Sequence, residues 1–113
     1  ITKRQEIAAR YTGELKGVVA PFVAEGNISA WAQYCIRVKD RAKMLETCTQ
    51  KGVPTGVYYP VPLHLQEVFK YLGYKRGDFA VSEAVAQDIM ALPMSAFVTK
   101  EEQDYVIEVI NNA

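Results

Sequence analysis

Hydrophobic and polar positions along the first fifty residues predict two helices and an extended region between them. Residues Ile1 to about Leu15 are charged and alanine-rich, and their apolar members recur at helical spacing: Ile7, Ala8, Tyr11 and Leu15. Val18–Val23 looks extended. Ala30–Val38 is rich in aromatic and β-branched residues, which predicts a strand with alternate positions on one face. A second helix is expected from Asp40, a capping residue, to about Lys51, where Gly52 stops it.

The second half of the chain predicts more strand and helix. Val53–Tyr59 is expected to be a second strand, and a short helical turn over Gln66–Tyr71 ends at Gly73. A helix is expected over about Phe79–Met90, capped by Asp78 and with its inward positions at Val81, Val85 and Ile89. A brief extended piece, Leu92–Met94, follows. The last helix is expected to run from a Thr99/Glu102 capping box to about Asn111, with one apolar face made of Val106, Val109 and Ile110. The fold class is therefore α+β, a small antiparallel sheet packed with helices.

Composition and charge exclude several classes of protein. The chain has 113 residues, 50% hydrophobic and 23% charged, as expected for one globular domain over residues 1–113. Thirteen basic residues balance thirteen acidic ones, which argues against nucleic acid or an anionic membrane as partner. No apolar run approaches the ~20 residues of a membrane span. Ile1–Glu6 is not a signal peptide, and the missing initiator methionine indicates a fragment or a processed chain.

The two cysteines bear on the compartment. Cys35 and Cys48 do not form a CxxC pair, and isolated cysteines in a neutral domain are typical of free, buried thiols. Free thiols indicate a reducing compartment, here the cytoplasm. A disulfide between the two residues is the alternative.

Candidate chemistry concentrates in one stretch, Tyr58–Gln66, which holds two adjacent tyrosines, two prolines and the only histidine. Pro60 and Pro62 each fix φ and remove a backbone donor, so the stretch is a stiffened loop able to present polar groups to a ligand. The alternative is a proline-rich connection whose tyrosines cap a core. His64 is a single histidine with no cluster of cysteine, aspartate or glutamate at ligand spacing, so no metal site is expected.

The same region resembles a known family. Gly52–Gln66 (GVPTGVYYPVPLHLQ) is similar to the signature of the carboxy-terminal domain of DegT/DnrJ/StrS-type sugar aminotransferases. Further stretches resemble that family in the same order along the chain: Ile7–Leu15 (IAARYTGEL), Ala30–Tyr34, Leu72–Tyr74, Gly77–Ala84 (GDFAVSEA, with Ala80 where the family has proline), Leu92–Met94 and Thr99–Val109. Together they cover essentially the whole chain.

The resemblance implies a fold, a cofactor and a reaction. Such enzymes have the fold of aspartate aminotransferase (fold type I), with a large domain that binds pyridoxal 5'-phosphate and a smaller α+β domain. They transfer an amino group from glutamate to a keto group of a nucleotide-linked sugar, in surface-polysaccharide, glycan or amino-sugar biosynthesis, and they form homodimers. This chain resembles the small domain alone. None of its lysines lies in the context of the family's cofactor lysine, so the chain is expected to bind no cofactor and to be inactive alone.

The resemblance also assigns roles within the loop. Tyr58 and Tyr59 occupy the positions that face the sugar nucleotide, although the family often has histidine at the first of them. His64 is a further candidate, able to reach a phosphate or carboxylate or to orient the loop through a backbone hydrogen bond. Pro60, Pro62 and Gln66 are expected to orient the loop. The alternative is that the two tyrosines lie on opposite faces of a strand, so that one is buried in the core and the other is left for the substrate.

A rival function remains open at this point. The same loop would serve a freestanding, non-catalytic module that binds sugar nucleotides or regulates another protein. The coding sequence upstream of Ile1 discriminates the two, because only the enzyme requires a large domain with the cofactor lysine.

Overall fold

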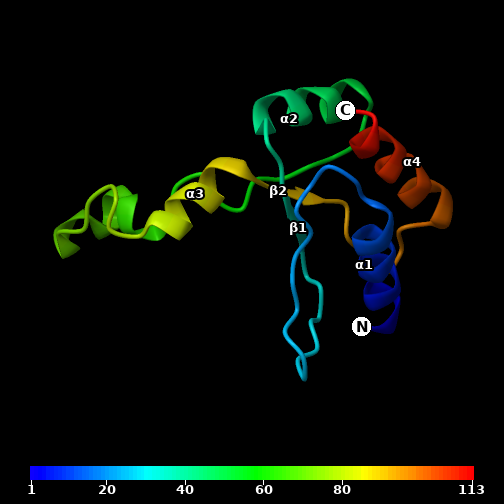
Figure 1. Cartoon of the computed structure of the whole chain (residues 1–113), viewed down its shortest axis with the longest axis horizontal. Helices are drawn as coiled ribbons and strands as arrows, with labels where there is room; N and C mark the ends of the chain where they lie inside the picture. The colour runs from blue at the N-terminus through cyan, green and yellow to red at the C-terminus, as the bar shows by residue number, and fades with distance from the viewer.

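The computed structural model describes all residues, 1–113, and confirms the α+β class (Figure 1). The elements, in chain order, are α1 (Thr2–Glu14), β1 (Tyr34–Arg37), α2 (Arg41–Gln50), the 3-10 helices η1 (Leu63–Leu65) and η2 (Glu67–Leu72), α3 (Ala80–Asp88), β2 (Ile89–Leu92) and α4 (Lys100–Asn111). None of these helices has the length and apolar character needed to cross a membrane.

The sheet is small and antiparallel. β1 and β2 pair along their whole length, and single bridges extend the sheet on both sides, from Val19 to Arg37 and from Gly56 to Ala91. β1 is shorter than the strand predicted over Ala30–Val38. Its buried positions nevertheless alternate as expected along the strand.

The predicted second strand over Val53–Tyr59 is wrong. Only Gly56 pairs with the sheet there, because Pro54 and Pro60 lack the N–H groups that a continuous ladder requires. β2 is the partner of β1 instead, in a segment for which the sequence predicted a helix end followed by a brief extended piece.

Arginine side chains explain why α3 gives way to β2. Arg37 donates through Nε and Nη2 to the two carboxylate oxygens of Asp88, each at 2.8 Å. Arg41 Nη1 donates to the carbonyl oxygens of Ala86 at 2.6 Å and Ile89 at 3.2 Å. These bonds satisfy carbonyls that the end of a helix leaves unpaired, so the chain can enter the sheet directly after Asp88.

Two of the predicted helix starts are confirmed. Asp40 accepts a hydrogen bond from the Lys43 amide at 3.1 Å, and Gly52 follows the helix with φ +73°, in the left-handed region. Thr99 and Glu102 form the expected capping box, in which each side chain accepts from the other residue's amide.

The third predicted cap is wrong. Asp78 accepts from the Lys75 amide at 2.8 Å and stabilises the preceding turn, while α3 begins without a side-chain cap. The inward face of α3 also differs from the expectation, because Val81 is exposed whereas Glu83 and Ala86 are buried. A buried carboxylate, described below, sets this orientation.

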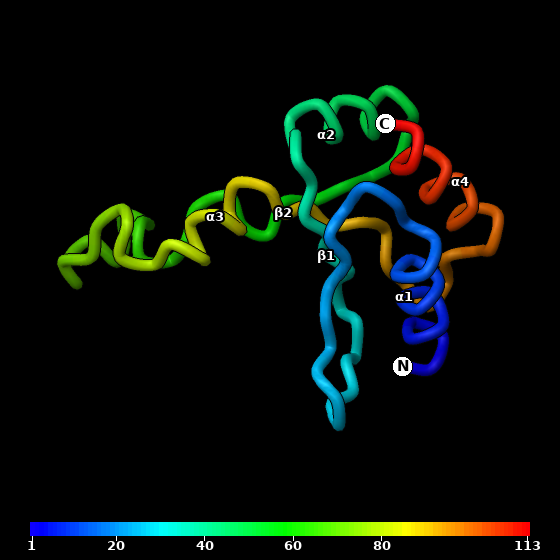
Figure 2. The backbone as a smooth tube through the Cα atoms, in the orientation of Figure 1, coloured from blue at the N-terminus to red at the C-terminus, as the bar shows by residue number.

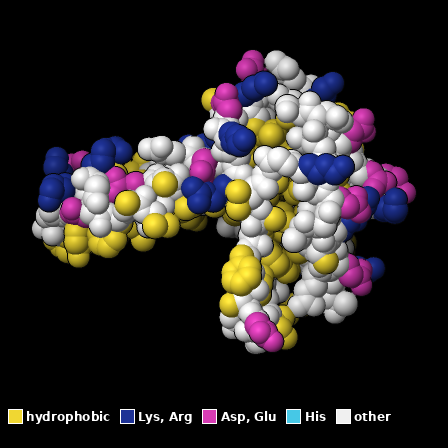
Figure 3. All heavy atoms as spheres, in the orientation of Figure 1, with side chains coloured by type: hydrophobic (Ala, Val, Ile, Leu, Met, Phe, Trp, Pro, Cys, Tyr) yellow, Lys and Arg dark blue, Asp and Glu magenta, His cyan; other side chains and the backbone are white.

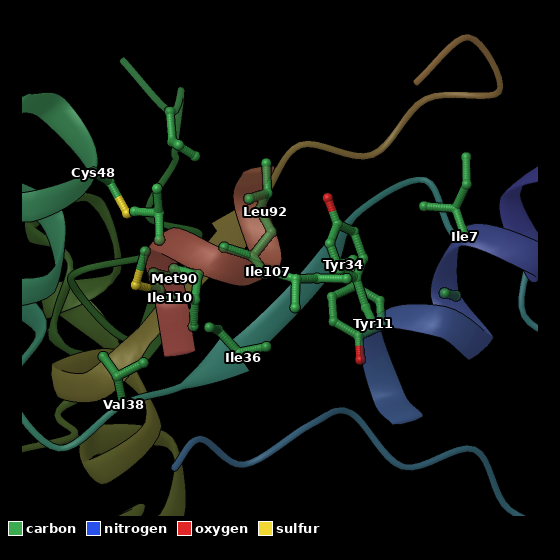
Figure 4. Packing of buried hydrophobic residues seen from close by; sticks show 14 residues of the cluster. Ile7, Tyr11, Tyr34, Ile36, Val38, Cys48, Met90, Leu92, Ile107 and Ile110 are labelled. Atoms are coloured by element: carbon green, nitrogen blue, oxygen red, sulfur yellow. The ribbon is translucent and has the colours of Figure 1, made fainter. Parts of the chain in front are cut away.

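The core lies between the sheet and helices α1, α2 and α4 (Figure 4). Its 14 buried residues include Tyr11 and Tyr34, whose ring centroids lie 5.0 Å apart. Tyr11 also donates through its hydroxyl to the Pro93 carbonyl at 2.9 Å. Both cysteines are free, as predicted: Cys48 lies in the core and Cys35 is half-buried.

Residues Tyr58–Asp88, called the arm below, project sideways from the sheet (Figures 1 and 2). None of them belongs to the 14-residue core. A loop over residues 18–33 projects in another direction (Figure 2). These projections make the radius of gyration 15.5 Å, against about 13 Å for a compact domain of this size. Hydrophobic atoms gather along one edge of the arm (Figure 3).

Candidate functional site

The loop that begins at Tyr58 leaves the sheet just after the Gly56 bridge and forms the base of the arm. Tyr58 is 42% exposed and Tyr59 67% exposed, with their rings edge to face at a centroid distance of 5.6 Å. Neither tyrosine enters the core, so the alternative in which alternation buries one of them is wrong. Both phenols are accessible to a ligand.

A groove of about 600 Å³, called the arm groove below, lies between this loop and α3. Its volume falls within the ~300–1,000 Å³ typical of small-molecule sites. The groove brings together five of the six predicted site residues, and only Pro60 does not line it: Tyr58, Tyr59, Pro62, His64 and Gln66. The remaining lining is mainly apolar. Gln66 also donates to the Val61 carbonyl at 3.3 Å, a contact within the loop of the kind expected for a loop-orienting residue.

His64 is the buried polar residue of the loop, and its partner is a carboxylate. Its Nε2 lies 3.1 Å from Glu83 Oε2, and both residues are more than nine-tenths buried. Its ring also meets Phe79 edge to face at 4.8 Å between centroids. This pair attaches η1 to α3. The backbone hydrogen bond considered for His64 from the sequence is replaced by a bond to a side chain.

Glu83 joins a third segment to the pair. Both of its carboxylate oxygens accept from the Gly77 amide at 2.9 Å, and Oε2 accepts from the Phe79 amide at 3.3 Å. One carboxylate therefore connects η1, the loop before α3 and α3 itself. The buried charge is satisfied by several donors, as a buried carboxylate requires.

These bonds also set the ionisation of Glu83. The hydrogen bond from the Gly77 amide holds the pKa of the Glu83 carboxyl below its usual range, although burial acts in the opposite sense, and the bonds from His64 and Phe79 lower it further. An ionised carboxylate can only accept hydrogen bonds, so His64 carries its hydrogen on Nε2. Nδ1 then has no partner within the chain and is not sealed from solvent, which leaves it available to a ligand.

The sequence interpretation missed Glu83 as part of the site. The residue lies within the GDFAVSEA stretch, where it was treated only as part of a motif. One signal could have identified it: Glu83 is the only charged residue of α3 before Asp88, in a helix otherwise made mainly of small and apolar residues. A lone charge on such a helix indicates a specific partner.

The metal-ligating side chains and the lysines bear on which cofactors the chain could hold. No group of three or more histidine, cysteine or acidic side chains could hold a metal ion. All eight lysines are exposed, and none lines the arm groove: Lys3, Lys16, Lys39, Lys43, Lys51, Lys70, Lys75 and Lys100. What the site presents is hydroxyl, imidazole and amide groups on an apolar surface.

Comparison with known proteins identifies the family. Residues 1–111 match the DegT/DnrJ/EryC1/StrS aminotransferase family. The chain belongs to this family. A crystal structure of a DegT DnrJ EryC1 StrS aminotransferase from Brucella abortus is 38% identical and superposes with a TM-score of 0.90 over 98% of this chain and 30% of that one. The resemblance noted in the sequence, and the fold that it implied, are thereby confirmed.

Two curated relatives extend the comparison. A "pleiotropic regulatory protein" of Geobacillus stearothermophilus is 39% identical over 96% of this chain and 30% of its own length. A UDP-2-acetamido-2-deoxy-3-oxo-D-glucuronate aminotransferase of Pseudomonas aeruginosa is 35% identical over 87% of this chain and 27% of its own. The chain thus spans about 30% of the length of such relatives.

Proposed function

We propose that this chain is the small, carboxy-terminal domain of a pyridoxal-phosphate-dependent aminotransferase that transfers an amino group from glutamate to a nucleotide-linked keto sugar. The observation that carries the proposal is the family match over residues 1–111. The name of the Pseudomonas aeruginosa relative, an aminotransferase of a UDP-linked oxo sugar, supports the substrate class. The product would enter surface-polysaccharide, glycan or amino-sugar biosynthesis.

Within that enzyme the chain's part is to position the sugar substrate. Tyr58, Tyr59 and His64 share the arm groove, where phenol hydroxyls can bond sugar or phosphate oxygens and aromatic rings can stack on an apolar sugar face. Pro60, Pro62 and Gln66 orient the loop, and Glu83 fixes His64. Each of these roles is a binding role, and none requires the chain to form or break a bond.

The cofactor does not fit this chain by itself. Pyridoxal phosphate in an aminotransferase is held by an activated lysine and a phosphate cradle, whereas every lysine here is exposed and none lines the groove. We therefore place the cofactor lysine in a large domain beyond this chain, as the family resemblance implies, and propose that the chain alone is inactive.

Assembly and compartment belong to the same proposal. The exposed apolar side chains along the arm suit a further protein surface, and we propose that the enzyme is a homodimer. The two free thiols favour a reducing compartment, and we propose the cytoplasm.

The test uses the full gene product that contains this chain, with the two half-reactions measured separately. Tyr58→Phe, Tyr59→Phe and His64→Ala should each slow the sugar half-reaction and spare the glutamate half-reaction. Loss of one neutral hydrogen bond, ~1 kcal/mol, lowers kcat/KM about fivefold, and loss of a bond to a charged phosphate lowers it up to about a hundredfold. Tyr71→Phe is the matched control, because Tyr71 is an exposed arm tyrosine that does not line the groove.

Two outcomes would contradict the site assignment. If all three variants keep the sugar kinetics of the unaltered enzyme, the loop is a structural brace. If the glutamate half-reaction falls in step with the sugar half-reaction, the loop maintains the fold of the active site and does not contact the sugar.

A regulatory role is the second candidate, and one observation favours it: the Geobacillus stearothermophilus relative carries a regulatory name. The same full gene product decides between the two. The regulatory role would be favoured if the gene product binds sugar nucleotides but transfers no amino group to any keto-sugar nucleotide offered.

A further inference from the structure

Side chains join the arm to the rest of the chain (residues 1–57 and 89–113) at a single place, the end of α3. Neither the 14-residue core nor the partly buried residues packed against it include any residue of the arm. Three side-chain hydrogen bonds cross the boundary, and all of them come from Arg37 of β1 and Arg41 of α2. The direction in which the arm leaves the sheet therefore depends on two arginines rather than on the core.

The two arginines hold different groups of the same helix end. Arg37 donates through two nitrogens to both carboxylate oxygens of Asp88, and such a two-point contact is geometrically more specific than a single bond. Arg41 Nη1 donates to the Ala86 carbonyl, which belongs to the arm, and to the Ile89 carbonyl, which belongs to β2. One guanidinium therefore bridges the arm and the sheet, while the other fixes the last side chain of α3.

The other crossing between the arm and the sheet lacks such bonds. Gly56, the last paired residue before the arm, exchanges two backbone hydrogen bonds with Ala91, of 3.2 and 2.7 Å. No backbone hydrogen bond joins residues 57–60 to the rest of the chain. Because only one of the two crossings is tied by side chains, loss of the arginine bonds should let the whole arm change direction.

The helix end that the arginines hold is also part of the arm groove. Ala86 and Ile89, whose carbonyls Arg41 binds, line the groove together with residues of the loop Tyr58–Gln66. Neither Arg37 nor Arg41 lines the groove, so neither acts by touching a ligand there. An effect of these arginines on the loop must therefore pass through the direction of the arm.

We propose that Arg37 and Arg41 are positioning residues that fix the direction of the arm and thereby hold the loop Tyr58–Gln66 where the rest of the enzyme needs it. The need for a fixed loop rests on the proposed function, whereas the fixed direction follows from the bonds at the end of α3. An arm freed of these bonds stays folded, because Glu83 bonds its partners without either arginine, but it takes more than one direction.

The test is pulsed electron paramagnetic resonance on the full gene product, with spin labels attached to p-acetylphenylalanine at position 43 of α2 and position 71 of the arm. Both positions are exposed, and this labelling leaves the cysteines unaltered. The unaltered protein should give one narrow distribution of distances between the labels. Arg37→Lys keeps the charge but cannot make the two-point contact, so the distribution should broaden or divide. The double variant Arg37→Lys/Arg41→Met should broaden it further.

Arg10→Lys is the matched control. Arg10 makes the same kind of two-point contact, with both carboxylate oxygens of Glu14, but that pair lies wholly on α1. The distance distribution should not change in this variant. The two half-reactions provide the second readout. A displacement of about 1 Å can cost about a hundredfold in rate, so Arg37→Lys should slow the sugar half-reaction by up to that factor and spare the glutamate half-reaction.

Two results would overturn the proposal. A narrow distribution that persists in Arg37→Lys and in the double variant would show that other contacts set the direction of the arm. A broadened distribution with an unaltered sugar half-reaction would show that the loop does not need the fixed direction. Should the double variant fail to fold, Asp88→Asn decides the question, because it removes only the charge that Arg37 binds, and an unchanged distribution contradicts the proposal.

Failure of the positioning role is separable from failure of the proposed function. The distances are measured without any substrate, so they report the direction of the arm whatever the gene product does. A broadened distribution in a protein that aminates no keto-sugar nucleotide would refute the proposed function and support the role of the arginines in directing the arm. An active aminotransferase whose distances ignore Arg37→Lys and the double variant would refute the positioning role alone.

Discussion

The arm and the rest of the chain, here called the body (residues 1–57 and 89–113), differ in how they bury apolar residues. The body has a 14-residue apolar core to which the arm contributes nothing, although Phe22, Ile28 and Phe97 of the body are also exposed. The arm leaves large apolar side chains exposed, among them Leu63, Val68, Tyr71 and Val81, and its buried polar pair is His64 with Glu83. One region is held by packing, and the other by a carboxylate that accepts hydrogen bonds from three residues on two other segments.

This difference indicates separate tasks. Exposed apolar surface on an ordered element marks an interaction site more often than a defect of packing. The same shape recurs in the aminotransferase from Brucella abortus, with a TM-score of 0.90 over 98% of this chain, so a projecting arm also occurs within a chain more than three times as long. The body supplies stability, whereas the arm supplies surface.

The largest effect on stability is expected from the body. Ile36→Ala removes a fully buried side chain from β1 and should lower the free energy of unfolding by about 2–5 kcal/mol. Val81→Ala, the matched change at a 77% exposed position of the arm, should leave it nearly unchanged. Urea unfolding followed by circular dichroism measures both. Equal losses in the two variants would show that the arm and the body share one core.

The second effect is confined to the arm. Glu83→Gln removes the charge that the Gly77 and Phe79 amides and His64 bind, so the arm should loosen while the body stays folded. Hydrogen exchange should accelerate at the Gly77 amide and remain unchanged in β1. Glu67→Gln, at an exposed arm position, is the control. Unfolding of the whole chain in Glu83→Gln would contradict the separation of the two regions.

The same two regions differ in how far the sequence predicts them. In the body, helical spacing and capping residues fix α1, α2 and α4, because each of these helices buries one apolar face against a single core. The β2 segment was missed because its apolar run Ile89–Leu92 continues the pattern of α3. Only Arg37 and Arg41, distant in sequence, bind the end of that helix and allow the strand.

In the arm, the local spacing of apolar residues predicted the structure less well than in the body. Apolar spacing in α3 predicted Val81 to be inward, yet the buried face carries Glu83, whose partners Gly77 and His64 lie on other segments. The loop itself was found correctly, since Pro60 and the adjacent tyrosines are visible without any tertiary contact. A site fixed by a long-range polar bond leaves little periodic signal in the sequence.

Acid should loosen the arm in a defined range of pH. Hydrogen bonds hold the pKa of Glu83 below its usual 4.5 in the folded protein, so the unfolded arm binds the proton more tightly. The stabilisation is complete above the unfolded pKa and is lost as pH falls through the folded one. Asp78, whose pKa is lowered chiefly by the Lys75 amide, acts in the same sense. Ring resonances of Tyr74 and Phe79 should report the change.

Two comparisons sharpen this pH prediction. In Glu83→Gln the acid transition of the arm should be nearly absent, because the main group that titrates is gone. The resonances of Tyr34 in the body should stay constant over the same range. An acid transition that is identical with and without Glu83 would assign it to Asp78 or to another carboxyl.

The smallest effect on the free energy of unfolding is expected from removing one tyrosine hydroxyl, and it should depend on whether that hydroxyl is buried or exposed. Tyr11 is fully buried, and desolvation raises its pKa to about 12, so its hydroxyl stays neutral and donates to the Pro93 carbonyl at 2.9 Å. Tyr11→Phe removes this bond without changing the packing of the ring and should lower the free energy of unfolding by about 1 kcal/mol. Tyr59→Phe in the arm should not change it, since that hydroxyl makes no bond within the chain. Urea midpoints measured at equal slope resolve a difference of this size. Equal midpoints for Tyr11→Phe and the unaltered protein would mean that water replaces the lost donor at Pro93, and that packing alone holds this part of the body.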